Sequence, residues 1–427
     1  MSCYVIEGGK PLCGEINLQG SKNTSLPILA AALLNKGICV IENCPDIEDV
    51  RTAIEIMQSL GCRVKREKNT VWVDSSGFRK YIIGESLMKK MRSSIVFLGS
   101  LLAVNKQAVV SYPGGCCLGE RPIDIHIGAF KKMGASIYEI YGNLYCLFDK
   151  GKGADIDLSY PSVGATENIM IAATLLKGKT VIKNPAKEPE IIHLQNFLNK
   201  LGADVTGAGT DCITIKGVRK LDKYVRFSIP YDRIACVTYL AMATATGGRI
   251  KINNAPVDEI KRELEIFQSM GCKVIKESKA VILDSGENLK GFGNIKTGPY
   301  PDFSTDSQPF MCVAGAVADG ESFIEEIVFE NRFCYAEELK KYNVNTKIAG
   351  RVLNINKSNI VCADTYACDL RGGAALCIAA LCADGISRIY NIEHIDRGYE
   401  YFDEIVRSLG GKITREDEEE KSIEGIG

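Results

Sequence analysis

The sequence lacks the features of a membrane, secreted or nucleic-acid-binding protein. No apolar run approaches the roughly 20 residues that cross a bilayer, and residues 1–10 lack the basic and apolar regions of a signal peptide. The 52 Lys and Arg residues nearly balance the 53 Asp and Glu residues, giving a formal net charge of -1. Such a balance offers no electrostatic footprint for nucleic acid or an anionic membrane. We therefore expect a cytoplasmic protein whose partners are small molecules, with no nucleic acid, membrane or obligatory protein partner.

Histidine is also scarce, since the chain has only His126, His193 and His394, far apart in the sequence. The 17 cysteines are an odd number without a paired Cys-x-x-Cys framework, so neither a disulfide framework nor a metal site is indicated. We expect most cysteines to be reduced and buried as small apolar residues. The sequence thus predicts no metal and no cofactor.

A short phrase recurs at intervals of roughly 70 residues: an apolar residue, Gly, a small residue, any residue, then Val or Ile. Its glycine is at positions 61, 134, 202, 271 and 410, and a degraded copy has Asn343 instead. Apolar residues at helical spacing, such as Val50, Ile54 and Met57, precede the phrase, so the glycine is interpreted as a helix C-cap. The alternation that follows it is typical of a strand.

A second segment of each copy is rich in small apolar residues, and a turn and a short strand such as residues 38–41 follow it. These segments are residues 26–34, 95–103, 168–176, 235–246, 310–318 and 374–383. Helices that are apolar on most faces are usually buried. Each repeat is therefore predicted to be a mixed α/β unit with one buried and one solvated helix.

Six such units predict two domains, because three units around one core make a domain of roughly 210 residues. The boundary is expected near Pro230, which gives residues 21–229 as one domain and residues 1–20 plus 230–427 as the other. The first strand, within residues 2–20, precedes the first buried helix and is free to pair with the C-terminal half. Two chain crossings and a cleft between the domains would result.

Charged groups stand at the openings of the buried helices, where Ser, Thr, Asn and Asp alone would be ordinary caps. Lys22, Arg92, Arg233 and Arg371 are the four cations in equivalent places. A cation there opposes the helix macrodipole by roughly 0.3–1 kcal/mol, so either surface carboxylates pair with it or an anionic ligand binds. Helix openings that converge in the cleft would bind phosphate or carboxylate groups. Asp306, in such a basic surround, would remain ionised and could accept a proton.

A glycine-rich loop over residues 112–122 contains Cys116, Cys117 and Arg121. Three glycines and two prolines in this span predict a mobile surface loop. The neighbouring arginine would lower a thiol pKa and favour reactivity, although chance placement of one of 17 cysteines remains an alternative.

At these residues the chain resembles the family of UDP-N-acetylglucosamine 1-carboxyvinyltransferases, which have the EPSP synthase-like fold. The resemblance covers essentially the whole chain and rests on Gly20-Ser21-Lys22-Asn23, Met91-Arg92-Ser93-Ser94, Pro113-Gly114-Gly115-Cys116, Gly119-Glu120-Arg121-Pro122-Ile123-Asp124, Ser162-Val163-Gly164-Ala165-Thr166-Glu167, Glu188-Pro189-Glu190-Ile191, Thr305-Asp306, Phe329-Glu330-Asn331-Arg332-Phe333, Asp369-Leu370-Arg371 and Asp396-Arg397-Gly398-Tyr399-Glu400. It implies two inside-out α/β barrel domains built from six βαβαββ-type units, with the active site in the interdomain cleft.

The resemblance also implies the reaction: transfer of the enolpyruvyl group of phosphoenolpyruvate to the 3′-hydroxyl of UDP-N-acetylglucosamine, the first step of peptidoglycan precursor synthesis. Cys116 would protonate the methylene carbon of phosphoenolpyruvate, and Asp306 would take the hydroxyl proton. Lys22 and Arg397 complete the implied catalytic set. Phosphoenolpyruvate would be bound by Lys22, Asn23, Arg121, Arg332, Arg371 and Arg397.

The implied contacts to the nucleotide sugar are Arg92, Arg121, Pro122, Ile123, Asp124, Ile125, Ser162, Val163, Gly164, Asp306 and Val328. Tyr160-Pro161 departs from relatives that have a lysine before the Ser-Val-Gly stretch, so packing would replace an ionic contact to uridine. Glu188 and Glu190 flank a proline and are interpreted as caps of the following helix rather than as catalytic acids.

Two alternatives remain open from the sequence. The shikimate-pathway enolpyruvyl transferase has a similar fold and the same donor, but the Gly-Gly-Cys-Cys loop argues against it. A silent paralogue that binds the nucleotide sugar and regulates a partner would need only part of the set Cys116, Asp306 and the arginines.

Overall fold

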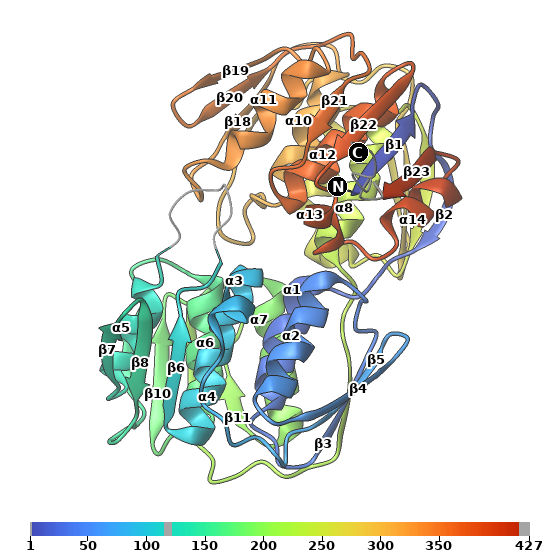
Figure 1. The fold of residues 1–427 in the computed structure, drawn as a ribbon. Coiled ribbons are helices and arrows are strands. Elements are labelled where there is room, and N and C mark those ends of the chain that lie inside the picture. Colours follow the sequence, from blue (N-terminus) through green and yellow to red (C-terminus); the bar gives the residue numbers. More distant parts are fainter. Residues whose placement is uncertain (1, 115–121, 418–427) are drawn as a thin grey trace, which may run out of the picture.

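The computed structural model describes residues 2–114 and 122–417. Its buried apolar side chains form two clusters. One cluster draws on residues 26–229, and the other on residues 4–18 together with residues 234–413. Figure 1 shows the two corresponding lobes, with α1 and α6 in the lower lobe and α8 and α12 in the upper one.

Six small sheets are formed within the described residues, and they share one pattern. Five of them combine two antiparallel pairs with one parallel pair at an edge. The sixth has three antiparallel strands, and an isolated parallel bridge between Ile82 and Val109 stands where the fourth strand would lie. This sixfold pattern agrees with the repeats predicted from the sequence.

The lower lobe has three of these sheets. In the list below, strands named next to each other within a sheet are hydrogen-bonded neighbours. The sheets are β13 (Val225–Ser228), β3 (Ile38–Glu42), β5 (Thr70–Asp74) and β4 (Arg63–Glu67); β6 (Gln107–Ser111), β8 (Asn143–Leu147) and β7 (Ser136–Ile140); and β11 (Asp204–Thr206), β12 (Cys212–Lys216), β10 (Lys179–Lys183) and β9 (Asp155–Asp157).

The upper lobe has the other three sheets, whose strands are again listed with hydrogen-bonded neighbours next to each other. They are β15 (Lys273–Lys276), β16 (Ala280–Asp284), β14 (Arg249–Asn253) and β2 (Cys13–Asn17); β17 (Gly293–Lys296), β18 (Ser322–Glu325), β20 (Val352–Ile355) and β19 (Thr346–Ala349); and β21 (Asp364–Tyr366), β22 (Ile386–Tyr390), β1 (Ser2–Glu7) and β23 (Lys412–Asp417).

The six helices rich in small residues are confirmed, and they are buried along nearly their whole length. They are α1 (Lys22–Ala32), α4 (Phe97–Asn105, preceded by the 3-10 turn η1 at Arg92–Val96), α6 (Val163–Ala173), α8 (Arg233–Ala245), α10 (Gln308–Ala316) and α12 (Leu370–Cys382). Small side chains allow these helices to pack closely in two groups of three, since α4 contacts α6 and α1, and α10 contacts α12 and α8. Five of these helices begin before the predicted range, and α4 begins two residues after it, because the preceding turn is the 3-10 segment η1.

The second helix of each unit is α2 (Glu48–Ser59), α5 (Asp124–Lys132), α7 (Pro189–Leu201), α9 (Lys261–Ser269), α11 (Tyr335–Lys341) or α14 (Phe402–Ser408). Shorter turns are α3 (Glu85–Lys90), η2 (Val257–Glu259), η3 (Arg332–Cys334) and α13 (Glu393–Asp396). The backbone after each second helix turns left-handed, with positive φ at Gly61, Gly134, Gly202, Gly271, Asn343 and Gly410. Asparagine is a residue that tolerates this conformation, which explains how the degraded copy keeps the same turn.

The prediction that charged groups take the place of ordinary caps at the openings of the buried helices is wrong for four of the six helices. The side chains of Ser21, Ser162, Asp232 and Asp369 accept hydrogen bonds from backbone N–H groups in the first turn of α1, α6, α8 and α12. The cations follow the cap residue by one or two positions: Lys22 after Ser21, Arg233 after Asp232, and Arg371 after Asp369. Their side chains contact carboxylates and do not cap the helices.

The N-terminal segment joins the C-terminal half, as predicted. Strand β1 pairs with β22 and β23, and β2 pairs with β14. The two crossings between the lobes lie side by side, since Ser21 N donates to Pro230 O at 2.8 Å and Asp232 N donates to Gln19 O at 3.0 Å. Gln19 also holds Glu400, whose backbone N–H donates to Gln19 Oε1 at 2.8 Å. Hydrogen bonds around Gln19 therefore connect the two crossing segments with each other and with Glu400 of the upper lobe.

Among the described cysteines no disulfide is formed. Nine of the 15 are buried, as the sequence predicts for most of them. None of the helices in the described ranges combines the length and apolar character needed to span a bilayer.

Candidate active site

A cavity of about 510 Å³ lies where the two lobes meet, and residues of both lobes line it. Of the residues predicted from the sequence, it is lined by Lys22, Asn23, Arg92, Pro122, Asp124, Ile125, Ser162, Val163, Gly164, Asp306, Val328, Arg332, Arg371 and Arg397. Ile123 does not line it, because its side chain is buried in the lower core. Cys116 and Arg121 lie outside the described residues.

Lys22, at the first position of α1, is held by a carboxylate that the sequence analysis missed. Its Nζ lies 2.9 Å from Asp49 Oδ2, and Arg397 Nε donates to Asp49 Oδ1 at 2.9 Å. Burial lowers the pKa of Lys22, and the charges of Arg397 and Arg371 add to that effect, whereas Asp49 opposes it. Asp49 therefore keeps two cations, one from each lobe, together at one end of the cavity.

Asp306 lies between two arginines at the opening of α10. Arg332 Nη2 donates to Asp306 Oδ1 at 2.8 Å, and Arg371 Nε is 3.5 Å from Oδ2. Burial alone would raise the pKa of Asp306, but Arg371 and then Arg332 outweigh it and hold this pKa at about 2. The carboxylate is therefore ionised at neutral pH, as the sequence predicts.

Arg371 brings unused donors to the cavity. Its side chain is buried, and within the described residues its Nε and Nη1 atoms make no hydrogen bond. Nε has a 3.5 Å ion-pair contact with Asp306, and both atoms are placed to donate to an anion that enters the cavity. The guanidinium also lies over the Tyr399 ring, 5.5 Å from its centroid, which fixes its plane.

Glu190 and Arg233 form a buried ion pair between the lobes. Arg233 Nε donates to Glu190 Oε1 at 3.0 Å, and both side chains are less than one-tenth exposed. The predicted capping role holds by position only, since Glu188 is the N-cap residue of α7 but its side chain makes no cap hydrogen bond, and Glu190 lies in the first turn. Glu188 Oε1 instead accepts from Tyr300 N in the other lobe at 3.4 Å.

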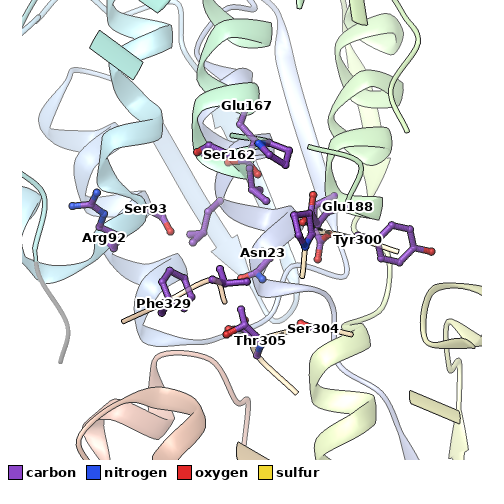
Figure 2. Close-up of a pocket in the computed structure, with 18 of the residues that line it drawn as sticks. Asn23, Arg92, Ser93, Ser162, Glu167, Glu188, Tyr300, Ser304, Thr305 and Phe329 are labelled. Atoms are coloured by element: carbon purple, nitrogen blue, oxygen red, sulfur yellow. Dashed lines mark hydrogen bonds between the residues drawn. The ribbon is translucent and has the colours of Figure 1, made fainter. Parts of the chain in front are cut away.

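Three acids meet on this side of the cavity, since Glu167 of α6 lies near Glu188 and Glu190. Burial raises the pKa of Glu167 well above its ordinary value, and the charges of Glu190 and Glu188 add to it. Figure 2 shows Glu167 beside Ser162 on the lower lobe, with Glu188 near Tyr300. A neutral Glu167 would offer a hydrogen-bond donor as well as an acceptor at this wall.

The opposite wall is formed by Arg92, Ser93 and a loop of the upper lobe that contains Phe329 (Figure 2). The buried carboxylate of Glu326 positions this loop, because it accepts hydrogen bonds from Val328 N at 2.8 Å and from Phe329 N at 3.1 Å. Its second oxygen accepts from Thr305 Oγ1 at 2.8 Å. Glu326 thus ties the loop around Val328 to the loop that ends at Asp306.

Sequence comparison identifies the group of proteins to which this arrangement is related. The family model of EPSP synthase (3-phosphoshikimate 1-carboxyvinyltransferase) matches residues 6–421. The chain belongs to the EPSP synthase family. Within it, the chain is 44% identical over 416 residues to UDP-N-acetylglucosamine 1-carboxyvinyltransferase 2 of Caldanaerobacter subterraneus subsp. tengcongensis, covering 97% of this chain and 100% of the relative. It is 42% identical over 418 residues to UDP-N-acetylglucosamine 1-carboxyvinyltransferase of Clostridium botulinum, covering 97% and 100%.

Solved structures of the EPSP synthase family have the same mixed α/β fold. The enolpyruvyl transferase NikO from Streptomyces tendae superposes with a TM-score of 0.88 at 25% identity, covering 97% of this chain and 98% of that one. An EPSP synthase from Acinetobacter baumannii superposes with a TM-score of 0.75 at 18% identity, covering 98% and 100%. The six small sheets described above are therefore those of an enolpyruvyl transferase fold.

Several cavity residues of this EPSP synthase family member were not predicted as site residues: Asp49, Glu167, Glu190, Arg233, Tyr300 and Phe329. The sequence does contain a signal for Arg233, because it is one of the four basic helix openings named above. Asp49 and Tyr300 give no comparable signal, because their place in the cavity depends on how the two lobes meet.

Proposed function

We propose that this chain transfers the enolpyruvyl group of phosphoenolpyruvate to the 3′-hydroxyl of UDP-N-acetylglucosamine and releases phosphate. The chain is thus a UDP-N-acetylglucosamine 1-carboxyvinyltransferase, which acts in peptidoglycan precursor synthesis, like the full-length relatives that are 42–44% identical to it. The structural observation that supports this most strongly is the ionised carboxylate of Asp306, set among Arg332, Arg371 and Lys22 in one interlobe cavity.

The cations would bind phosphoenolpyruvate. Its phosphate and carboxylate need several donors, and the proposed set is Lys22, Asn23, Arg121, Arg332, Arg371 and Arg397. The buried donors of Arg371 that make no hydrogen bond within the described residues support this role. Fixed cations in a cavity stabilise the charge that develops during addition and elimination better than mobile water does.

Asp306 would accept the proton of the 3′-hydroxyl as the oxygen adds to the central carbon of phosphoenolpyruvate. Its pKa of about 2, set by the neighbouring arginines, makes it a weak base. An anionic donor that engages Arg371 and Arg332 weakens their hold on Asp306, and this raises the basicity of the carboxylate when the substrate is present. Cys116, which lies outside the described residues, would protonate the methylene carbon. Loss of phosphate and of a proton from the tetrahedral intermediate restores the double bond.

The nucleotide sugar would lie along the lower-lobe wall. The proposed contacts are Arg92, Arg121, Pro122, Ile123, Asp124, Ile125, Ser162, Val163 and Gly164, with Asp306 and Val328 at the reacting end. Tyr160 and Pro161 line the cavity next to Ser162, which supports the interpretation that packing replaces an ionic contact to uridine. Ile123, with its buried side chain, would contribute only through its backbone.

The proposal includes the domain division, with residues 21–229 in one inside-out α/β barrel domain and residues 1–20 plus 230–427 in the other. The two separate apolar clusters and the paired crossings at Ser21 and Asp232 support it. It also includes a cytoplasmic location, which the sequence analysis expects.

The test is phosphate release from phosphoenolpyruvate by the purified protein, measured with UDP-N-acetylglucosamine and separately with shikimate 3-phosphate. We expect release only with the nucleotide sugar. Release only with shikimate 3-phosphate would overturn the acceptor, and binding of the nucleotide sugar with release in neither reaction would favour a silent binding paralogue.

A further inference from the structure

Two cysteines that are 34 residues apart in the sequence meet beside the cavity. Cys334 ends η3, and Cys368 precedes the cap of α12. Their Sγ atoms are 3.4 Å apart, and Asp369 Oδ2 lies 3.6 Å from the first and 3.7 Å from the second. Both cysteines are half-buried, whereas most other described cysteines are buried.

The three distances describe one face of a tetrahedral metal site. A cation about 2.3 Å from each of two sulfurs and about 2.1 Å from an oxygen holds the sulfurs about 3.8 Å apart and each sulfur about 3.6 Å from the oxygen. The observed separations differ from these by at most a few tenths of an ångström. A disulfide would instead require the sulfurs to close to about 2.05 Å.

The carboxylate is also oriented for this role. Asp369 Oδ1 accepts cap hydrogen bonds from Arg371 N at 2.9 Å and Gly372 N at 3.0 Å, and Arg332 Nη1 lies 3.8 Å away. These bonds fix the side chain and leave Oδ2 directed at both thiols. Support of this kind, from groups that hold a ligand in place, is a regular feature of metal sites in proteins.

We propose that Cys334, Cys368 and Asp369 form a binding site for Zn²⁺ or another thiophilic divalent cation, with water as the fourth ligand. Binding would exchange the two thiol protons for one cation, and the thiolates would select it against Mg²⁺ and Ca²⁺. The described lining of the cavity includes Asp369 but neither cysteine, so the cation would be bound at the border of the cavity. It would join η3, which contains Arg332, to the opening of α12, which contains Arg371, and so stiffen the two arginines.

The test uses Cd²⁺, whose thiolate complexes absorb in the ultraviolet, and Zn²⁺ in a competition titration with the full-length chain under reducing conditions. We expect Cys334→Ser/Cys368→Ser to lose one equivalent of tight binding. The loss should exceed about 100-fold in affinity, because removal of a mere supporting group already costs about 10–100-fold. The matched control is Cys13→Ser/Cys362→Ser, two exposed cysteines that are not part of the cluster. All variants retain Cys116 and Cys117, so any binding at that loop is common to them.

A second measurement separates binding from folding. Zn²⁺ should raise the thermal unfolding midpoint of the wild type and of the control variant but not that of the cluster variant. The single variant Asp369→Asn, which keeps a cap acceptor, should show weaker binding with both thiols present. Equal stoichiometry and affinity in the cluster variant and the control would overturn the proposal.

Discussion

Asp49 Oδ2 lies 2.9 Å from the Nζ of Lys22, and the two side chains are almost fully buried. The other oxygen of Asp49 accepts a hydrogen bond from Arg397 of the opposite lobe. Burial would raise the pKa of Asp49, but Lys22 and then Arg397 outweigh it and lower this pKa. Asp49 is thus a fixed anion that keeps a buried lysine protonated and aligns it with an arginine from the other lobe.

We predict that Asp49→Asn shifts the alkaline limb of kcat/KM for phosphoenolpyruvate to lower pH. Asp49 raises the pKa of Lys22 against the effect of burial, so its loss lets the lysine deprotonate at lower pH. The measurement is a pH profile of the initial rate. Asp46→Asn is the matched control, because Asp46 pairs with the exposed Arg51 of α2. An unchanged alkaline limb would show that Lys22 does not depend on Asp49.

Asp306→Asn should abolish transfer while leaving the binding of UDP-N-acetylglucosamine largely intact. The amide has nearly the same shape but cannot accept the hydroxyl proton, and a positioned base is worth roughly 10²–10⁴-fold in rate. Calorimetry gives the affinity, and phosphate release gives the rate. Asp319→Asn serves as the control, since Asp319 is an exposed acid that pairs with Lys357. Lost binding with unchanged chemistry would contradict the role assigned to Asp306.

Cys116→Ala should remove most turnover, roughly 10²–10⁴-fold, because the loop cysteine is the proposed proton donor to the methylene carbon. Its neighbour provides the matched control: Cys117→Ala should retain activity, since the family pattern assigns the acid to the first cysteine of the pair. A near-native rate in Cys116→Ala, or an equal loss in both variants, would show that the assignment within the pair is wrong.

The repeats made the fold accessible from the sequence. Helical periodicity, a glycine at the end of each outer helix and six segments of small residues predicted the element types and their order. The repeated glycine marks a backbone conformation. Asn343 has the same left-handed conformation as the five glycines, although the residues around it no longer match the repeated phrase. The sequence indicated one strand within residues 2–20 that is free to pair with the C-terminal half. The structure has two, β1 and β2, and both pair there.

Side-chain contacts between the two lobes could not be predicted from the repeats. Asp49 has the sequence context of an ordinary acid in the first turn of a helix, and only the docking of the lobes brings it to Lys22 and Arg397. Glu190 was expected to cap α7, since the local pattern contains no sign of Arg233. Within the upper lobe, Cys334 and Cys368 lack the close spacing that marks a metal site in a sequence, and only the folded arrangement brings their sulfurs to 3.4 Å.

The Glu190–Arg233 pair yields the prediction that depends most on burial. Glu190→Gln should destabilise the protein by about 3–5 kcal/mol, because it leaves the Arg233 charge buried without its counter-ion. Replacing both residues, as Glu190→Leu/Arg233→Met, should recover most of that loss, since a buried pair adds little over apolar packing. Urea unfolding of Glu190→Leu, of Arg233→Met and of the double variant measures the coupling. Glu42→Gln, which removes the exposed partner of Arg226, should leave the unfolding midpoint unchanged. If the double variant were as unstable as the sum of the singles, the two side chains would act independently, and the pair would not be what holds α7 against α8.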